Sequence, residues 1–192
     1  DPKSGSKQQR IHIMNAKDLM GIDTLADIIK AGIESVKIEG RMKSNLYVAN
    51  AVSSYRNAID YCHQQLTQNQ PLDTTYLTAL KTQLSAVSNR TFSTGGLEQR
   101  PHGSSLNTQF SHYQKTVQYI GLVHTTDQHG NWICSIKSDF TNSDQLLLLT
   151  PHKPFQPISF SNYTDIQNNP LEKAKPNSII KLTTQNPIEP LS

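Results

Sequence analysis

Apolar and polar side chains alternate over residues 35–40, the most informative short stretch of the chain. Val36 and Ile38 occupy one face, while Lys37 and Glu39 occupy the other. Alternation of this kind predicts a strand with one buried face, which we place at Ser35–Gly40. A polar turn then leads directly into a helix.

This helix is predicted over Asn45–Gln65, with Ser44 as its N-cap residue. Its apolar residues recur at spacings of three and four, which defines one buried face. The residues of this face are Val48, Val52, Tyr55, Ile59 and Cys62.

A similar pair of elements lies upstream. Ile11–Met14 predicts a short strand, and Asn15–Leu19 reads as a loop or a helix start. A helix is predicted from about Thr24 to Ala31, with Asp23 or Thr24 as its N-cap and Gly32 just beyond its C-terminus. The order strand, helix, strand, helix with short links is typical of a parallel α/β unit.

The second half of the chain changes character. A polar segment containing Pro71 leads to a shorter predicted helix, about Thr74–Val87. From Val117 onward the pattern predicts short strands, with Asp127–Asn131 as a hairpin turn between the first two. The predicted strands are Val117–His124, Trp132–Lys137, Gln145–Thr150, Pro157–Ser161 and Ser178–Thr184. Strands of this length and spacing favour a small β-barrel or sandwich.

These elements divide the 192 residues into three predicted parts. Residues 1–65 form the end of an α/β unit, residues 66–116 a linker with one helix, and residues 117–192 a small β-barrel domain. A closed α/β barrel needs eight strands and roughly 200–250 residues, so two strand–helix units leave open sheet edges. The predicted fold class is therefore α/β plus β: the closing strand–helix units of a TIM-like barrel, followed by a C-terminal β-barrel. The chain begins with Asp1 rather than Met, which also favours a portion of a longer protein.

Charge is unevenly distributed and small overall, with a net charge of +3. Residues 1–65 hold nine Lys and Arg against seven Asp and Glu, and residues 66–116 hold four against two. Residues 117–192 hold five against six. A nucleic-acid contact is therefore expected in the first two-thirds of the chain.

Alternate side chains of a barrel strand face the helices and the lumen. With Val36 and Ile38 toward the helices, Lys37 and Glu39 should point into the lumen and pair, because a buried charge needs a partner. Arg41 follows at the end of the strand where barrel active sites lie, and its planar fork suits a carboxylate or a phosphate. The alternative is a structural ion pair that orders the barrel mouth.

Three further residues are predicted to bind substrate beside Lys43. Lys17 and Asp18 follow the upstream strand and so should reach the same mouth, although Asp18 serves equally well as a helix cap. Arg90 lies in a glycine-containing loop, Ser88–Gly96, that either binds phosphate or simply connects two elements. No metal-binding spacing is found among the seven histidines, and no metal site is predicted.

The chain has two cysteines, Cys62 and Cys134, far apart in the sequence. We interpret them as buried small hydrophobic residues in a reducing compartment. We expect no secretory leader, and no apolar run of these residues approaches the ~18 residues of a membrane span. We therefore expect a cytoplasmic protein with no membrane partner.

Several of these stretches resemble the C-terminal portion of the U-thirty-two peptidase family, the collagenase-like proteases. The resemblance is strong from Ile13 to Asp60 and centres on Ala31–Ser44, which includes Lys37, Glu39, Gly40, Arg41 and Lys43. It continues more weakly through three later segments: Ser88–Gly95, Gln118–Val123 and Lys137–Asp144. The Pro71–Thr74 linker and the Ile13–Asn15 stretch are most similar to the bacterial branch associated with tRNA hydroxylation.

The resemblance implies an α/β-barrel enzyme with an appended β-barrel that hydroxylates the wobble uridine of tRNA. It also implies an iron–sulfur cluster and prephenate for the intact protein. The family cysteines lie upstream of the matching portion, so no cofactor is predicted for this chain. We expect the intact protein to be an enzyme and this portion alone to be inactive.

Two alternatives stay open at this point. One is a peptidase, a hydrolase of the type that the family name describes. The other is a non-catalytic module whose β-domain binds a protein partner.

Overall fold

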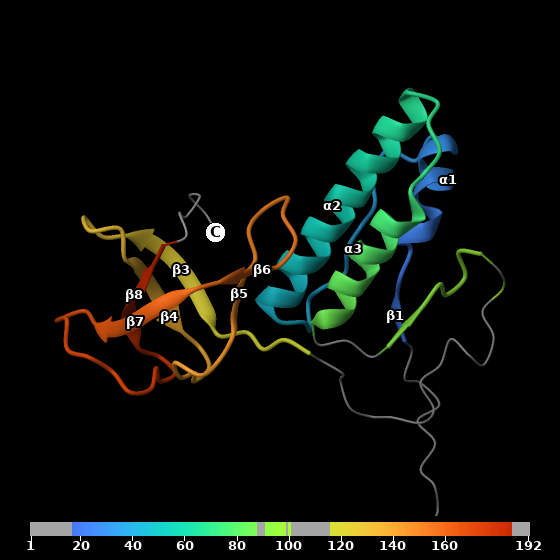
Figure 1. The fold of residues 1–192 in the computed structure, drawn as a ribbon. Helices are drawn as coiled ribbons and strands as arrows, with labels where there is room; N and C mark the ends of the chain where they lie inside the picture. The colour runs from blue at the N-terminus through green and yellow to red at the C-terminus, as the bar shows by residue number, and fades with distance from the viewer. Residues whose placement is uncertain (1–16, 88–90, 99, 101–115, 186–192) are drawn as a thin grey trace, which may run out of the picture.

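The computed structural model describes residues 17–87, 91–98, 100 and 116–185. Three α-helices lie in the first half of the chain and most strands follow them, which gives a mixed α/β fold with several sheets (Figure 1). The predicted strand Ile11–Met14 lies outside the described residues. Whether the first unit closes a TIM-like barrel stays a prediction.

The first helix, α1 (Leu25–Lys30), follows a 3₁₀ turn, η1 (Ile22–Thr24). Its end confirms the role predicted for Gly32, which adopts a φ of +76°. The Gly32 N–H donates to the carbonyl of Ile29 and the Ile33 N–H to that of Ile28, as in a Schellman motif. No side chain caps the start of α1; Thr24 instead donates its hydroxyl to the Gly21 carbonyl.

The long helix α2 (Asn45–Thr67) begins where predicted, with the Ser44 hydroxyl accepting the Tyr47 N–H at 3.2 Å. Its buried face differs from the predicted one, because Val52 is 49% exposed. The face is instead built largely from small residues, which allow neighbouring helices to approach closely. The buried residues of α2 are Tyr47, Asn50, Ala51, Ser53, Ser54, Ala58 and Cys62.

Helix α3 (Thr74–Ala86) packs against α2 through the predicted stripe of Leu77, Leu80, Leu84 and Val87, all of which are buried. A buried amide pair locks the two helices together. Asn50 Nδ2 donates to the main-chain carbonyl of Gln83 at 2.9 Å, and the Gln83 side-chain Nε2 donates to Asn50 Oδ1 at 3.0 Å. Reciprocal bonds of this kind offset the cost of burying the amides.

The strand predicted at Ser35–Gly40 is wrong: these residues have no regular secondary structure. A strand needs a partner backbone, and no strand of the described residues pairs with this segment. Parallel pairing occurs instead between β1 (Asp18–Leu19) and β2 (Phe92–Ser93), at positions predicted to be loop. The register pairs Asp18 with Phe92. These residues are so far apart in the sequence that a local pattern of apolar and polar residues cannot predict the pairing.

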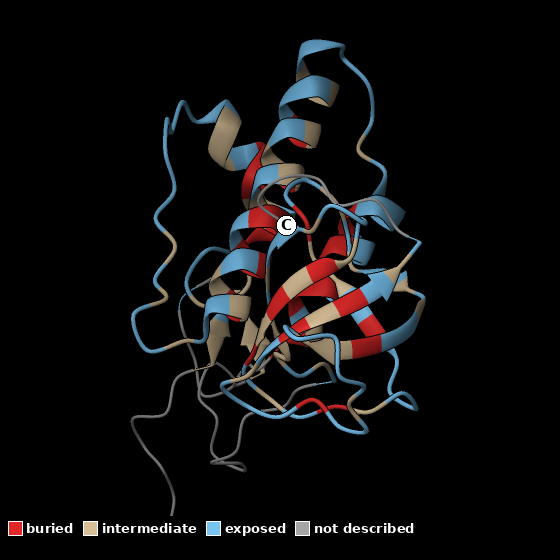
Figure 2. Cartoon of the chain, turned by 90° about the vertical axis from the view of Figure 1, so that its left-hand side faces the viewer, coloured by how far each residue is buried: buried red, intermediate tan, exposed pale blue. Residues whose placement is uncertain are grey.

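The β-rich part contains a four-stranded antiparallel sheet in the order β3-β4-β8-β7. Its strands are β3 (Gly121–Thr126), β4 (Trp132–Ile136), β7 (Phe160–Asp165) and β8 (Ile179–Thr184). Buried residues alternate with intermediate or exposed residues along most of β4 and β8 (Figure 2). The predicted turn at Asp127–Asn131 joins β3 and β4, with Gly130 at a φ of +82°.

A second antiparallel pair, β5 (Leu146–Leu148) and β6 (Gln156–Ile158), forms a separate sheet, and its Leu146 packs in the same hydrophobic cluster as β4 and β8. Among the described strands β5 and β6 pair only with each other, so this part contains two sheets, and the small β-barrel stays a prediction. The predicted strand Pro157–Ser161 is in fact two strands that meet at Ser159, and β7 runs on to Asp165.

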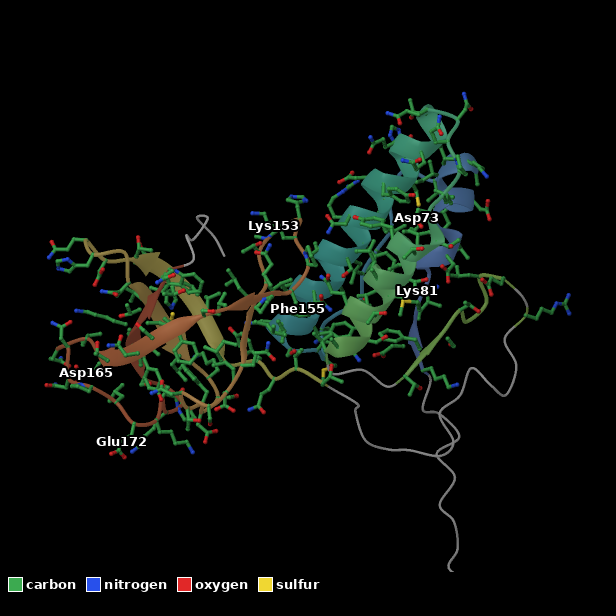
Figure 3. The ribbon with its side chains drawn as sticks, in the orientation of Figure 1. Asp73, Lys81, Lys153, Phe155, Asp165 and Glu172 are labelled. Atoms are coloured by element: carbon green, nitrogen blue, oxygen red, sulfur yellow. The ribbon has the colours of Figure 1, made fainter. Side chains whose placement is uncertain are left out.

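Two separate hydrophobic clusters support the fold. The first gathers α1, α2 and α3, and the second lies on the inner face of the four-stranded sheet around Trp132 and Tyr163. Phe155, in the loop between β5 and β6, packs against the first cluster and so links the two parts (Figure 3). None of the helices in the described part of the chain has the length and apolar character needed to cross a membrane.

Candidate functional site

A pocket of about 670 Å³ lies where β1, the segment 36–43 and the first turns of α2 meet. It is lined by six of the seven residues predicted from the sequence to carry function, and by Gly40. These seven lining residues are Lys17, Asp18, Lys37, Glu39, Gly40, Arg41 and Lys43. Arg90 lies outside the described residues.

An ion pair between Lys43 and Asp18 forms the centre of this pocket. Lys43 Nζ lies 2.6 Å from Asp18 Oδ2, and each side chain is only 14% exposed. The Lys43 ammonium also lies 4.6 Å from the centre of the Tyr47 ring, within cation–π range. Asp18 is therefore an ion-pair partner rather than the helix cap that the sequence left open.

Lys37 and Glu39 are also brought together, but at the surface. Lys37 Nζ lies 3.8 Å from Glu39 Oε2, with the side chains 88% and 73% exposed. The pair was predicted to be buried in a barrel lumen, and it is not. Residues 33–40 pair with none of the described strands, so no sheet encloses the two side chains. An ion pair this exposed contributes little to stability.

Arg41 is exposed and lines the same pocket as these two ion pairs. Lys17, which precedes Asp18 in the sequence, lines it as well. Lys17, Lys37 and Arg41 thus line the same pocket as Lys43. The Lys43 ammonium is largely buried and is fixed by its ion pair with Asp18. Such a cluster can attract and orient an anionic group, carboxylate or phosphate.

Two aromatic residues of α2 complete the site and were not assigned to it from the sequence. Tyr55 Oη accepts the Gly21 N–H at 2.8 Å and so fixes the turn before η1. Burial raises the pKa of Tyr55, partly offset by this hydrogen bond. Tyr47 lies in the first turn of α2, four residues after Lys43 in the preceding turn, and no pattern of the sequence assigned it to the site.

Gly40 allows the rim to pack closely onto α2. A Cβ atom at this position would lie 2.7 Å from Val48 Cγ2. The turn at residues 40–43 therefore approaches the helix more closely than a larger residue permits, which positions Arg41 and Lys43.

The two cysteines do not form a site for a metal cluster. Cys62 lies in α2 and Cys134 in β4, each buried in a different hydrophobic cluster. Burial raises the pKa of both thiols, that of Cys134 to about 12, and so disfavours the thiolate that binds metal. Across residues 17–87, 91–98, 100 and 116–185, no three His, Cys, Asp or Glu side chains gather as a metal site would require.

Residues 1–107 match the family model described as Peptidase family U32. The chain is 31% identical over 141 residues to tRNA hydroxylation protein P of Escherichia coli (strain K12), covering 73% of this chain and 29% of that relative. It is 31% identical over 181 residues to tRNA hydroxylation protein P1 of Bacillus subtilis (strain 168), covering 92% of this chain and 41% of that relative. The chain thus spans less than half the length of either relative.

Among solved structures, the C-terminal domain of a U32 peptidase from Geobacillus thermoleovorans is similar to part of the chain. The two share 22% sequence identity with a TM-score of 0.35, over 39% of this chain and 94% of that structure.

Proposed function

Because the chain belongs to peptidase family U32, we propose that it is part of an enzyme that hydroxylates tRNA, the activity that names its relatives in Escherichia coli and Bacillus subtilis. In this proposal the chain supplies the C-terminal portion of the enzyme. The substrate is the wobble uridine that the family resemblance implies. Partners other than RNA are not required by the proposal.

The observation that carries the proposal is the mostly buried ion pair between Lys43 and Asp18, bordered by further cationic side chains. Asp18 holds the Lys43 ammonium in one position, so that its charge is directed into the pocket. Arg41 is then placed to clamp an anionic group of the substrate or co-substrate through two parallel N–H bonds. Lys17 and Lys37 add positive potential at the rim, and Glu39 restrains Lys37.

We further propose that the helical unit closes an α/β barrel supplied by the rest of the protein. Two observations support this view. Segment 33–40 is extended between two helices without strand partners among the described residues, and Val36 and Val52 are exposed although apolar. In the intact enzyme this segment would pair as a barrel strand and turn Lys37 and Glu39 toward the lumen.

The test is nucleoside mass spectrometry of tRNA from a strain that lacks the gene for the intact protein. We expect 5-hydroxyuridine derivatives to be lost and to return on complementation with the intact gene. Complementation with Arg41→Ala should restore less than a tenth of the modification, since a bidentate, charge-assisted contact is worth about 1.5–3 kcal/mol.

Arg56→Ala is the matched control, because Arg56 is an exposed arginine of α2 that pairs with Asp60 within the same helix. It should restore full modification. Unchanged 5-hydroxyuridine in the deletion strain would refute the proposal. Loss of casein or collagen cleavage in that strain, with tRNA unaffected, would support the peptidase alternative instead.

A further inference from the structure

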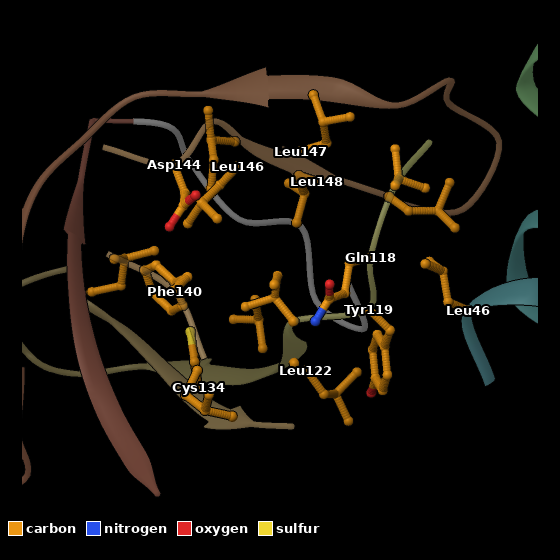
Figure 4. A pocket seen from close by; sticks show the side chains of 18 of the residues that line it. Leu46, Gln118, Tyr119, Leu122, Cys134, Phe140, Asp144, Leu146, Leu147 and Leu148 are labelled. Atoms are coloured by element: carbon orange, nitrogen blue, oxygen red, sulfur yellow. The ribbon is translucent and has the colours of Figure 1, made fainter. Parts of the chain in front are cut away.

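A second pocket, of about 500 Å³, lies between the start of α2 and the β-rich part (Figure 4). Leu46 of α2 borders it on one side, and Tyr119, Leu122, Leu147 and Leu148 border it on the others. Leu122 and Leu147 are exposed, so the pocket opens to solvent beside large apolar side chains. Its volume lies within the range of about 300–1,000 Å³ found for small-molecule sites.

The charged groups of this pocket favour a neutral occupant. Of the described residues that line it, none is Lys, Arg or His, and two are carboxylates. Asp139 pairs with Lys173, and Asp144 accepts the N–H and the hydroxyl of Thr141. Both carboxylates therefore remain in place as negative charges, which repel a phosphate or a carboxylate.

Polar groups at the mouth can recognise the edge of a planar ring. Gln118 is exposed and carries its amide toward the middle of the pocket, between Leu148 and Leu122 (Figure 4). Asn45, also exposed, contributes a second amide from the first turn of α2. Each amide offers a donor and an acceptor at once, which matches the mixed edge of a uracil or cytosine.

Aromatic and buried groups of the wall fit the same occupant. Tyr119 lies next to Gln118 and provides a π face on which a base can stack. Trp132 also lines the pocket, is 1% exposed, and its indole N–H has no acceptor among the described residues. A ring carbonyl is the kind of group that would satisfy this donor, and an aliphatic side chain is not.

The two pockets lie on opposite sides of the start of α2. Tyr47, Ala51 and Tyr55 recur every four residues along α2 and line the first pocket together with Lys43 of the preceding turn, whereas Asn45, Leu46 and Ala49 line this one. A nucleic-acid strand that crosses the start of α2 can therefore place a phosphate in the first pocket and a base in the second.

We propose that this second pocket takes one unstacked pyrimidine base of an RNA strand. That the strand is RNA rests on the proposed function, whereas the assignment of a base to the pocket rests on the residues that line it. A leucine-rich segment of a protein partner is the competing occupant. The Tyr119 ring and the buried Trp132 donor favour the base, because a purely apolar segment would leave the indole N–H without a partner.

Trp132 makes the proposal directly measurable, since it is the one tryptophan of the chain. Its fluorescence is followed while the 192-residue chain is titrated with single-stranded pentauridylate, pentaadenylate or an abasic pentamer of equal phosphate number. We expect pentauridylate to change the emission and to bind at least tenfold more tightly than the abasic pentamer.

Variants separate stacking from general binding. Tyr119→Leu should weaken pentauridylate binding roughly tenfold, whereas Tyr119→Phe should bind as the wild type does, because the ring is kept. Gln118→Leu should abolish the preference for pentauridylate over pentaadenylate. Tyr76→Leu, at an exposed tyrosine of α3, is the control and should bind normally. Circular dichroism establishes that each variant is folded.

Two results would overturn the proposal. One is equal affinity for the abasic pentamer and pentauridylate, which would mean that only phosphates are bound. The other is an emission change with a leucine-rich peptide but not with pentauridylate, which would identify a protein partner. If a deletion strain keeps its 5-hydroxyuridine while the chain still binds pentauridylate through Tyr119, the proposed function fails and the pocket assignment stands.

Discussion

The ammonium of Lys43 lies 2.6 Å from the carboxylate of Asp18, although 25 residues separate them in the sequence. The pair joins β1 to the turn that precedes α2. Both side chains are largely shielded from solvent, and the Tyr47 ring covers the ammonium. This contact organises the cationic pocket, because it holds one positive charge in place before any ligand arrives.

Removing one partner of this pair should destabilise the helical unit. Lys43→Met leaves the Asp18 carboxylate shielded without its cation, a change that typically costs about 3–5 kcal/mol in a fully buried setting. Because each side chain keeps 14% exposure, we expect about 2–3 kcal/mol in urea-induced unfolding followed by circular dichroism. Lys30→Met, which removes an exposed pair with Asp27, should cost less than about 0.5 kcal/mol. Equal effects of the two changes would contradict the structural role of Lys43.

The Tyr55 hydroxyl should contribute to the stability of the helical unit. Tyr55→Phe removes the acceptor of the Gly21 N–H, and an unsatisfied donor costs about 1–2 kcal/mol. Thermal unfolding should therefore occur at a lower temperature. Tyr76→Phe is the control, because the Tyr76 hydroxyl has no hydrogen bond among the described residues, and its effect should be negligible. An unchanged midpoint for Tyr55→Phe would show that water replaces the lost acceptor.

Two aspartates should make the β-rich part sensitive to acid. Asp127 accepts hydrogen bonds from His129 and Asn131, and Asp165 accepts them from Gln167 and Asn169. The bonds from the Asn131 and Asn169 side chains are the largest causes that lower the pKa of each carboxyl.

A carboxyl whose folded pKa is lowered contributes stability above its unfolded value, about 3.9, and loses it as the pH falls through the folded pKa. Unfolding monitored by Trp132 fluorescence should thus show stability declining below about pH 4. Asp127→Asn combined with Asp165→Asn should flatten this decline. Glu34→Gln, at an exposed position in the helical unit, should leave it unchanged. A decline that persists in the double variant would assign the acid sensitivity to other groups.

Gly121 should not tolerate a side chain. A Cβ atom there would lie 2.2 Å from the Ser135 carbonyl oxygen on β4, and a backbone atom in a paired strand cannot move aside easily. Gly121→Ala should therefore destabilise the sheet by about 1–3 kcal/mol, measured by urea unfolding with Trp132 as the probe. Thr126→Ala, at an exposed position on the same strand, should stay within about 0.5 kcal/mol of the wild type. Wild-type stability for Gly121→Ala would mean that β3 shifts freely.

Local signals were sufficient to predict the elements whose hydrogen bonds close within a few residues. Ser44 caps α2, Gly32 ends α1 and Asp127–Asn131 turns between β3 and β4, as predicted. The apolar stripe of α3 was also correct. Each of these depends on atoms fewer than about ten residues apart, so the sequence pattern contains the necessary information.

Long-range pairing required the tertiary structure. The alternation at Ser35–Gly40 predicts a strand, but a strand also needs a partner backbone, and none of the described strands provides one. The pairing of Asp18 with Phe92 was missed for the converse reason, since two-residue strands have no pattern of their own. Val52 was misplaced because small and polar residues, Asn50 among them, form the buried face of α2 through partners on α3.

The candidate site shows the same division. The charged residues around the turn, Lys37, Glu39, Arg41 and Lys43, and the helix that starts directly behind them could be predicted from the residues alone. The pairing of Lys43 with Asp18, the surface position of the Lys37–Glu39 pair and the contribution of Tyr47 and Tyr55 to the pocket could not. Charge and helix propensity belong to individual residues and their near neighbours, whereas ion-pair partners and burial depend on how distant segments pack.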